Sequence, residues 1–123
     1  MTTAVITAQA PTAIGARAHA ACTLSAHLHA GTHHPKANRY WRITVTTQPS
    51  SVLVHASYEF FYASQLVSTQ YPYSAPHFAF RGHFTDPAIL WPSNSVGINL
   101  RFRVHLVSHC GTHDLDYSIR VRR

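Results

Sequence analysis

Acidic side chains are the scarcest class in this chain of 123 residues. The only acidic residues are Glu59, Asp86, Asp114 and Asp116, against ten Lys and Arg residues and eleven His residues. So few carboxylates argue against a carboxylate-rich metal site and against hydrolases that use two acidic residues. The formal net charge of +6 indicates an acidic partner, unless the arginines only form a solvated face.

Long apolar runs and catalytic motifs are missing too. No run approaches 18 apolar residues, so we predict no membrane span, and the N-terminus does not resemble a signal peptide. No G-x-S-x-G, P-loop or G-x-G-x-x-G motif occurs. His109 and Cys110 would point to opposite faces of an extended strand, which argues against a Cys–His nucleophile. We therefore expect a non-enzymatic protein that needs no cofactor.

Strong helix formers are few, with one Lys and one Glu, whereas Thr, Ser, Val, Tyr and Phe are frequent. This composition favours an all-β chain. Apolar and polar residues alternate most clearly in 98–106 and 114–122, which predicts two strands with one buried face each. Residues 108–113 contain a glycine and predict the turn of a C-terminal hairpin. The expected pairs are Leu106 with Leu115, Val104 with Tyr117, and His105 with Asp116.

Shorter alternating runs precede this hairpin and are separated by turn-forming residues. The expected strands are 4–8, 22–29, 39–47, 52–62, 65–70 and 77–84. About seven to eight short strands with frequent turns are typical of an antiparallel β-sandwich. The length predicts a single domain over residues 1–123, with residues 1–20 as an extended N-terminal arm or edge strand.

Several local motifs resemble those of a known group of domains. They are Trp41 on an early strand, "GHFTD" at 82–86, "WP" at 91–92 before an Arg-rich strand, and "GTHDLDY" at 111–117. With these motifs, residues 34–123 resemble the immunoglobulin-like domains of actinobacterial surface proteins and tailed-phage virion proteins. The resemblance implies an immunoglobulin-like antiparallel β-sandwich and a structural role on a virion or an extracellular surface. The disulfide of antibody domains is not implied, because Cys22 precedes Trp41 and Cys110 lies in the last turn.

The two cysteines leave three alternatives open. Cys22 and Cys110 could form a disulfide between the N-terminal strand and the last turn, remain two buried thiols, or link separate chains. A terminal strand beside the last hairpin would bring the two sulfur atoms within reach of each other.

A group of histidines is the candidate metal site. His27 and His29 share one face of a strand, about 6–7 Å apart, and His33 and His34 follow in the next loop. Such a group can chelate zinc or copper. The alternative is that these histidines are exposed or lie in an interface, since no carboxylate is nearby in the sequence to orient the rings.

Aromatic residues and arginines form the candidate interface. Residues 57–80 hold eight aromatics, more than one face of a short sheet can bury, and Phe61 is expected on the outer face. The candidate interface residues are Phe61, Tyr71, Tyr73, Arg101, Arg103 and Arg120. Arg and aromatic residues are enriched in interfaces while Lys and Glu are depleted, so we expect copies of the chain, or other virion or assembly proteins, as partners. Nucleic acid is not expected, because no aromatics interleave the arginines. The alternative function is a secreted module that binds a glycan or a metal.

Overall fold

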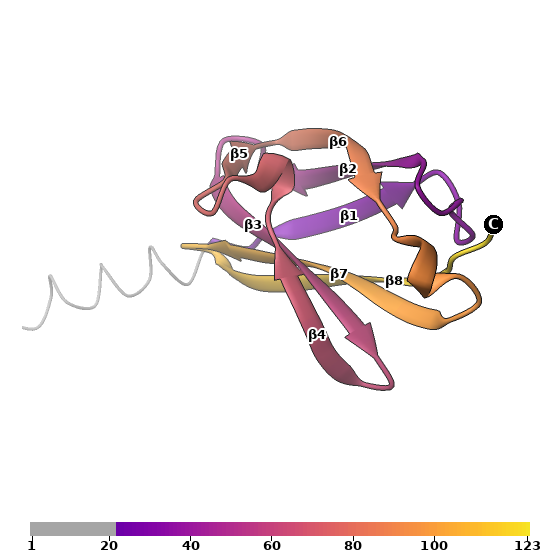
Figure 1. Ribbon diagram of the computed structural model, residues 1–123. Coiled ribbons are helices and arrows are strands. Elements are labelled where there is room, and N and C mark those ends of the chain that lie inside the picture. The colour runs from indigo at the N-terminus through magenta and orange to yellow at the C-terminus, as the bar shows by residue number, and fades with distance from the viewer. Residues whose placement is uncertain (1–21) are drawn as a thin grey trace, which may run out of the picture.

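The computed structural model describes residues 22–123. The regular elements of these residues are β-strands and two short 3-10 turns (Figure 1). The expected strand at 4–8 and the arm at 1–20 lie outside the described residues. The strands are β1 (Ser25–Ala30), β2 (Tyr40–Gln48), β3 (Leu53–Tyr62), β4 (Gln65–Gln70), β5 (Ala79–Arg81), β6 (His83–Leu90), β7 (Asn99–Ser108) and β8 (Gly111–Arg120). The 3-10 turns are η1 (Pro72–Ser74) and η2 (Ser93–Ser95). Among the described residues, no helix is long and apolar enough to cross a membrane.

The strands form two antiparallel sheets. The smaller sheet has the order β1-β2-β6, and the larger has the order β4-β3-β7-β8, with β5 paired to the first half of β3. Figure 1 shows the two sheets as separate layers. The predicted all-β antiparallel sandwich with a C-terminal hairpin is confirmed, whereas its immunoglobulin-like character stays a prediction.

The core lies between the two layers and follows the predicted alternation of side chains. Residues of β2 such as Ile43 and Val45 are fully buried against Val104 and Leu106 of β7. Aromatic rings fill the centre, where Phe102 lies between Trp41 and Tyr58, with ring centroids 5.4 and 5.1 Å away. Burial of these apolar faces is the main force that holds the sheets together.

The C-terminal hairpin forms as expected, but the predicted pairing is wrong by two residues. The observed pairs are Leu106 with His113, Val104 with Leu115, Phe102 with Tyr117, Arg103 with Asp116, and His105 with Asp114. Both strands continue through the residues expected in the turn, so that only His109 and Cys110 separate Ser108 from Gly111. Gly111 has a φ of +116°, which suits glycine in so tight a turn. A shift of two residues leaves every side chain on its predicted face.

The two ends of the described chain are tied to the rest of the sandwich. A disulfide joins Cys22 to Cys110, whose Cα atoms are 5.0 Å apart, so the structure adopts the first of the three alternatives for the cysteines. At the opposite end of β8, residues 33–37 run along the strand. The amide of Arg120 donates a hydrogen bond to the carbonyl of His33, and the amide of Arg122 donates one to the carbonyl of Pro35, both at 2.9 Å.

Candidate interaction surface

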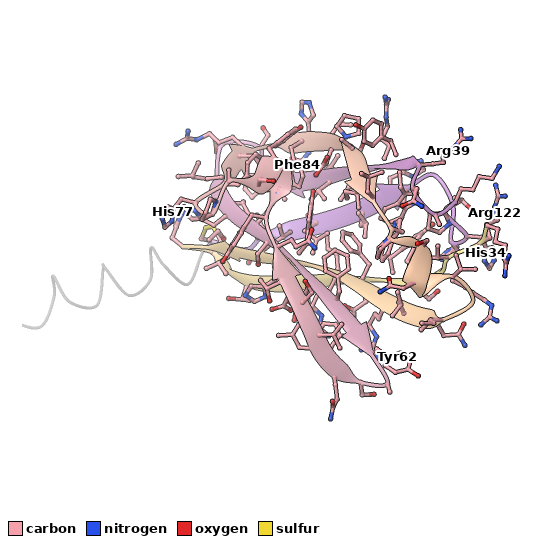
Figure 2. The ribbon with its side chains drawn as sticks, viewed as in Figure 1. His34, Arg39, Tyr62, His77, Phe84 and Arg122 are labelled. Carbon is pink, nitrogen blue, oxygen red and sulfur yellow. A yellow bond between two sulfur atoms is a disulfide. The ribbon has the colours of Figure 1, made fainter. Side chains whose placement is uncertain are left out.

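Strand β4 extends beyond the smaller sheet. At one side of the sandwich β1 packs near β8, and at the other side β6 is the last strand of the smaller sheet. The larger sheet continues past β3 to β4, which projects away from the body together with the end of β3 (Figure 1). Tyr62, at the end of β3, lies on this projecting hairpin (Figure 2). Among residues 22–123, the side of β4 that would face the core therefore has no strand opposite it.

Two hollows lie beside β4, the first mainly apolar and the second lined by apolar and polar groups alike. The first has a volume of about 350 Å³ and includes Phe60, Val67, Leu90 and Trp91 in its lining. The second has a volume of about 450 Å³ and is lined in part by Tyr71, Tyr73 and Asp86. Gln70 and Leu90 line both hollows, so the two form one continuous surface.

Large apolar side chains are exposed along these hollows. We call them the β4 surface, which consists of Tyr62, Val67, Tyr71, Tyr73 and Leu90. Val67 and Leu90 are 58% and 55% exposed, and Leu66, on the outer side of β4, is 51% exposed. Exposed apolar residues that cluster in this way mark interaction sites more often than scattered ones do.

The β4 surface is also electrically neutral and lies at an open strand edge. Residues 60–76 contain no Asp, Glu, Lys, Arg or His, although the chain as a whole is strongly basic. Natural sheets protect their edges with charges, proline or a covering segment. Strand β6 has Asp86 and Pro87, and β8 has charged residues and the covering segment 33–37. Strand β4 has no charge and no proline, and no strand among residues 22–123 pairs with its free edge. Its one irregularity is a shift of its register opposite Phe60 and Phe61 of β3.

The predicted interface residue Arg103 lies on the outer face of the larger sheet, within a network of charges. Its guanidinium is 2.7 Å from Asp116, 3.6 Å from Asp114 and 3.7 Å from Glu59. The hydrogen bond to Asp116 is the main cause that raises the pKa of Arg103 above its ordinary value. The excess of basic residues indicated an acidic partner for the arginines, but Arg103 is paired by carboxylates of its own chain. The shifted register places Asp116 directly opposite it.

The other predicted interface residues divide between two faces. Phe61 lies on the outer face as expected, half-buried beneath Arg103 and Arg101, whose guanidinium carbons are 4.6 and 5.8 Å from its ring centroid. Arg120 donates a hydrogen bond to Asn99 at 2.8 Å. Within residues 22–123, neither Arg101 nor Arg120 forms an ion pair. Tyr71 and Tyr73, by contrast, belong to the β4 surface.

The four histidines of the candidate metal site do not come together as one ligand set. His27 and His29 are exposed on β1, as predicted. The Nδ1 atoms of His33 and His34 instead donate hydrogen bonds to the backbone carbonyls of Ser118 and Arg120, at 2.7 and 3.4 Å. Over residues 22–123, the group of three ligand atoms close enough to hold a metal ion is Cys22, His109 and Cys110. The sequence indicated that Cys22 and Cys110 could meet, but it placed His109 on the opposite face from Cys110, so His109 was missed as a member of this group.

A buried polar pair connects the two sheets beneath the second hollow. Tyr58 of β3 donates a hydrogen bond of 2.8 Å to Oδ2 of Asp86 on β6, and both residues are at most 5% exposed. The other carboxylate oxygen, Oδ1, accepts a hydrogen bond from the amide of Ala88. Alternation predicted an inward side chain for Tyr58, but nothing in the sequence pointed to its partner.

Replacing Tyr58 with phenylalanine should lower the free energy of unfolding by about 1–3 kcal/mol. The variant keeps the ring but leaves Oδ2 of the buried Asp86 without its donor, which costs the desolvation of that oxygen. Urea denaturation of the two proteins measures the difference. Tyr62→Phe is the matched control, and we expect a change below about 0.5 kcal/mol because Tyr62 is exposed. Equal effects of the two variants would contradict a stabilising role of the pair.

Because of Tyr58, we also expect the free energy of unfolding to depend on pH under alkaline conditions. Burial, and then the hydrogen bond to Asp86, raise the pKa of Tyr58 above its ordinary value of 10.0. Above pH 10 the unfolded chain therefore loses a proton that the folded chain keeps, and the free energy of unfolding falls by up to about 1.4 kcal/mol per pH unit. Tyr58→Phe lacks this loss, so the difference in stability between the two proteins should narrow above pH 10.

No protein-family model matches this chain, and no curated protein or solved structure matches it. Its function is therefore inferred from its own residues.

Proposed function

We propose that this protein is a non-enzymatic structural module that docks through its β4 surface in a repetitive assembly. The observation that carries the proposal is an uncharged strand edge, unpaired among the described residues, beside an apolar surface in an otherwise charged molecule. Interfaces of stable assemblies have apolar centres depleted in charge, and the β4 surface has this composition. An open edge also offers backbone donors and acceptors to an incoming strand.

The partner we favour is a second copy of the same chain. Two copies each carry a net charge of +6 and repel at most of their surface, but they can meet at β4 without bringing like charges together. An antiparallel β4–β4 contact would pair both open edges in one arrangement with two-fold symmetry.

The setting we propose follows from the resemblance of residues 34–123 to immunoglobulin-like domains of virion and surface proteins. In a tailed-phage virion the module would be a capsid decoration or a tail component, and on a bacterial surface it would be a filament subunit. Arg101 on the outer face, without an ion pair among the described residues, would then contact an acidic neighbour in the assembly.

Replacing Val67 with arginine should weaken self-association at least about tenfold in Kd, which corresponds to about 1.4 kcal/mol. The variant places a charge on each copy at the point where the two neutral edges meet. Analytical ultracentrifugation over a concentration series measures the Kd. The matched control is Val107→Arg, which adds the same charge at a residue 41% exposed on the outer face of β7.

We expect Val107→Arg to associate like the wild type, and both variants to melt at the temperature of the wild-type monomer. A chain that stays monomeric at millimolar concentration would contradict self-assembly through β4, as would equal weakening by both variants.

A second candidate function is glycan binding in the second hollow. Its lining combines the exposed rings of Tyr71 and Tyr73 with polar groups of Gln70 and Asp86. Aromatic faces beside a few fixed polar groups are suited to a sugar ring. Binding to a glycan array by a monomeric chain, lost in Tyr73→Ala and kept in Val67→Arg, would favour this function over assembly.

A further inference from the structure

One imidazole lies against both sulfur atoms of the disulfide. His109 and Cys110 are the two central residues of the β7–β8 turn, and Cys22 precedes β1. Nε2 of His109 is 3.5 Å from Sγ of Cys22 and 3.6 Å from Sγ of Cys110. We expected His109 and Cys110 to point in opposite directions, as neighbours on an extended strand do. The tight turn overrides that alternation and brings both side chains close to Cys22. The disulfide itself appears as a yellow bond in Figure 2.

These separations match those between ligand atoms in a tetrahedral zinc site. With Zn–S near 2.3 Å and Zn–N near 2.0–2.1 Å, a sulfur and a nitrogen ligand lie about 3.6 Å apart, and two sulfur ligands about 3.8 Å apart. The two S···N distances in the protein are already at this value. Only the two sulfur atoms would have to separate, and the Cα distance of 5.0 Å allows this by rotation of the side chains.

We propose that reduction of the Cys22–Cys110 disulfide converts this end of the protein into a zinc site with the ligands Cys22, Cys110 and His109. Two thiolates balance the charge of Zn²⁺ and are ligands that zinc prefers, so the scarcity of carboxylates in this chain is no obstacle. The cysteines are half-buried and His109 is exposed, which leaves the fourth position open to water or an external ligand. Cys22, which precedes β1, would thus be held to the last hairpin by a covalent bond under oxidising conditions and by a metal under reducing ones.

The conversion requires a reductant, which is a dithiol or a phosphine. The S–S bond breaks as it accepts two electrons and two protons. A dithiol supplies both and is oxidised to its own disulfide, whereas a phosphine supplies the electrons, takes the oxygen of a water molecule to become its oxide, and leaves that water's two protons for the thiols. Each thiol then loses one proton to solvent as its sulfur binds Zn²⁺. This step uses no residue of the β4 surface, so the proposal stands or fails independently of the proposed function.

The test is a titration of the reduced full chain with Co²⁺, followed by displacement with Zn²⁺. We expect one Co²⁺ per chain, with thiolate-to-metal charge transfer and the intense visible bands of a tetrahedral site. The oxidised chain should give neither signal. Loss of an outer-shell partner alone weakens metal binding roughly 10- to 100-fold, so loss of a ligand in His109→Ala should weaken Co²⁺ binding by at least about tenfold.

Two control variants make the assignment specific. Cys22→Ser/Cys110→Ser should abolish the charge-transfer band, whereas His27→Ala/His29→Ala should bind like the reduced wild type. If reduction unfolds the chain, restoration of its β circular dichroism by Zn²⁺ in the wild type but not in His109→Ala supports the site. Reduced wild type that binds Co²⁺ no more tightly than the double serine variant would overturn the proposal. A His109→Ala variant that binds Co²⁺ as tightly as the wild type would also overturn it. If reduction unfolds the chain, failure of Zn²⁺ to refold the reduced wild type would overturn it as well.

Discussion

Replacing Phe102 with alanine is expected to lower the free energy of unfolding by about 3–5 kcal/mol. Phe102 is fully buried, and its ring lies within about 6 Å of the rings of Trp41, Tyr58, Phe60 and Trp91. These aromatics come from both sheets and from the segment after β6. They cannot all collapse into the space that the ring leaves, so a cavity remains in the centre of the core. Urea denaturation monitored by tryptophan fluorescence measures the loss.

Phe61→Ala is the matched control for Phe102→Ala. Phe61 follows Phe60 on β3 but lies on the outer face, half-buried beneath the guanidinium groups of Arg101 and Arg103. Its removal costs two exposed cation–π contacts and partial burial, so we expect a loss below about 1.5 kcal/mol. Losses of the same size at Phe61 and Phe102 would contradict the placement of Phe102 in the core and of Phe61 on the outer face of the larger sheet.

Breaking the Cys22–Cys110 disulfide is expected to lower the free energy of unfolding by about 4 kcal/mol. The bond joins residues 88 apart in sequence, and a loop of that length removes much conformational entropy from the unfolded chain. The comparison is between oxidised and phosphine-reduced wild type, both in the presence of a chelator so that zinc does not stabilise the reduced form. Denaturation in urea with the same slope for both forms gives the difference directly.

The double variant Cys22→Ser/Cys110→Ser is the control for this experiment. It should match the reduced wild type in stability to within about 1 kcal/mol and should not respond to the reductant. A reductant effect on the double variant would show that the loss comes from another cause. A wild type whose stability is unchanged by reduction would contradict the disulfide as a stabilising link.

The disulfide and the β4 surface lie in different parts of the sandwich. The covalent or metal link holds Cys22, which precedes β1, to the β7–β8 turn. The β4 surface lies on the hairpin that projects away from the smaller sheet (Figure 1). A change in redox state would therefore alter stability without directly altering the docking edge. The two sets of variants can be tested separately.

The faces of the strands could be predicted from the sequence alone. Alternation over 39–47 and 52–62 matches β2 and β3 to within one residue at each end, and it assigned Trp41, Val54 and Tyr58 correctly to the core. This succeeds because the two-residue period of a strand is a local property of the backbone. Which side chain faces the core depends only on neighbours in the sequence, and burial of the apolar face selects that side.

The register of the hairpin, the Tyr58–Asp86 pair and the Cys22–His109–Cys110 group were decided only by the tertiary structure. A shift of two residues preserves every buried face, so the hydrophobic pattern cannot choose between the two pairings, and the geometry of the turn at Gly111 does. Tyr58 meets Asp86 only because β3 and β6 belong to different sheets that pack face to face. The inner face of β4 likewise lies uncovered because, among the described residues, the smaller sheet ends at β6 and the larger sheet continues to β4. The relative width and placement of two sheets are long-range properties, and no periodicity within a single strand encodes them.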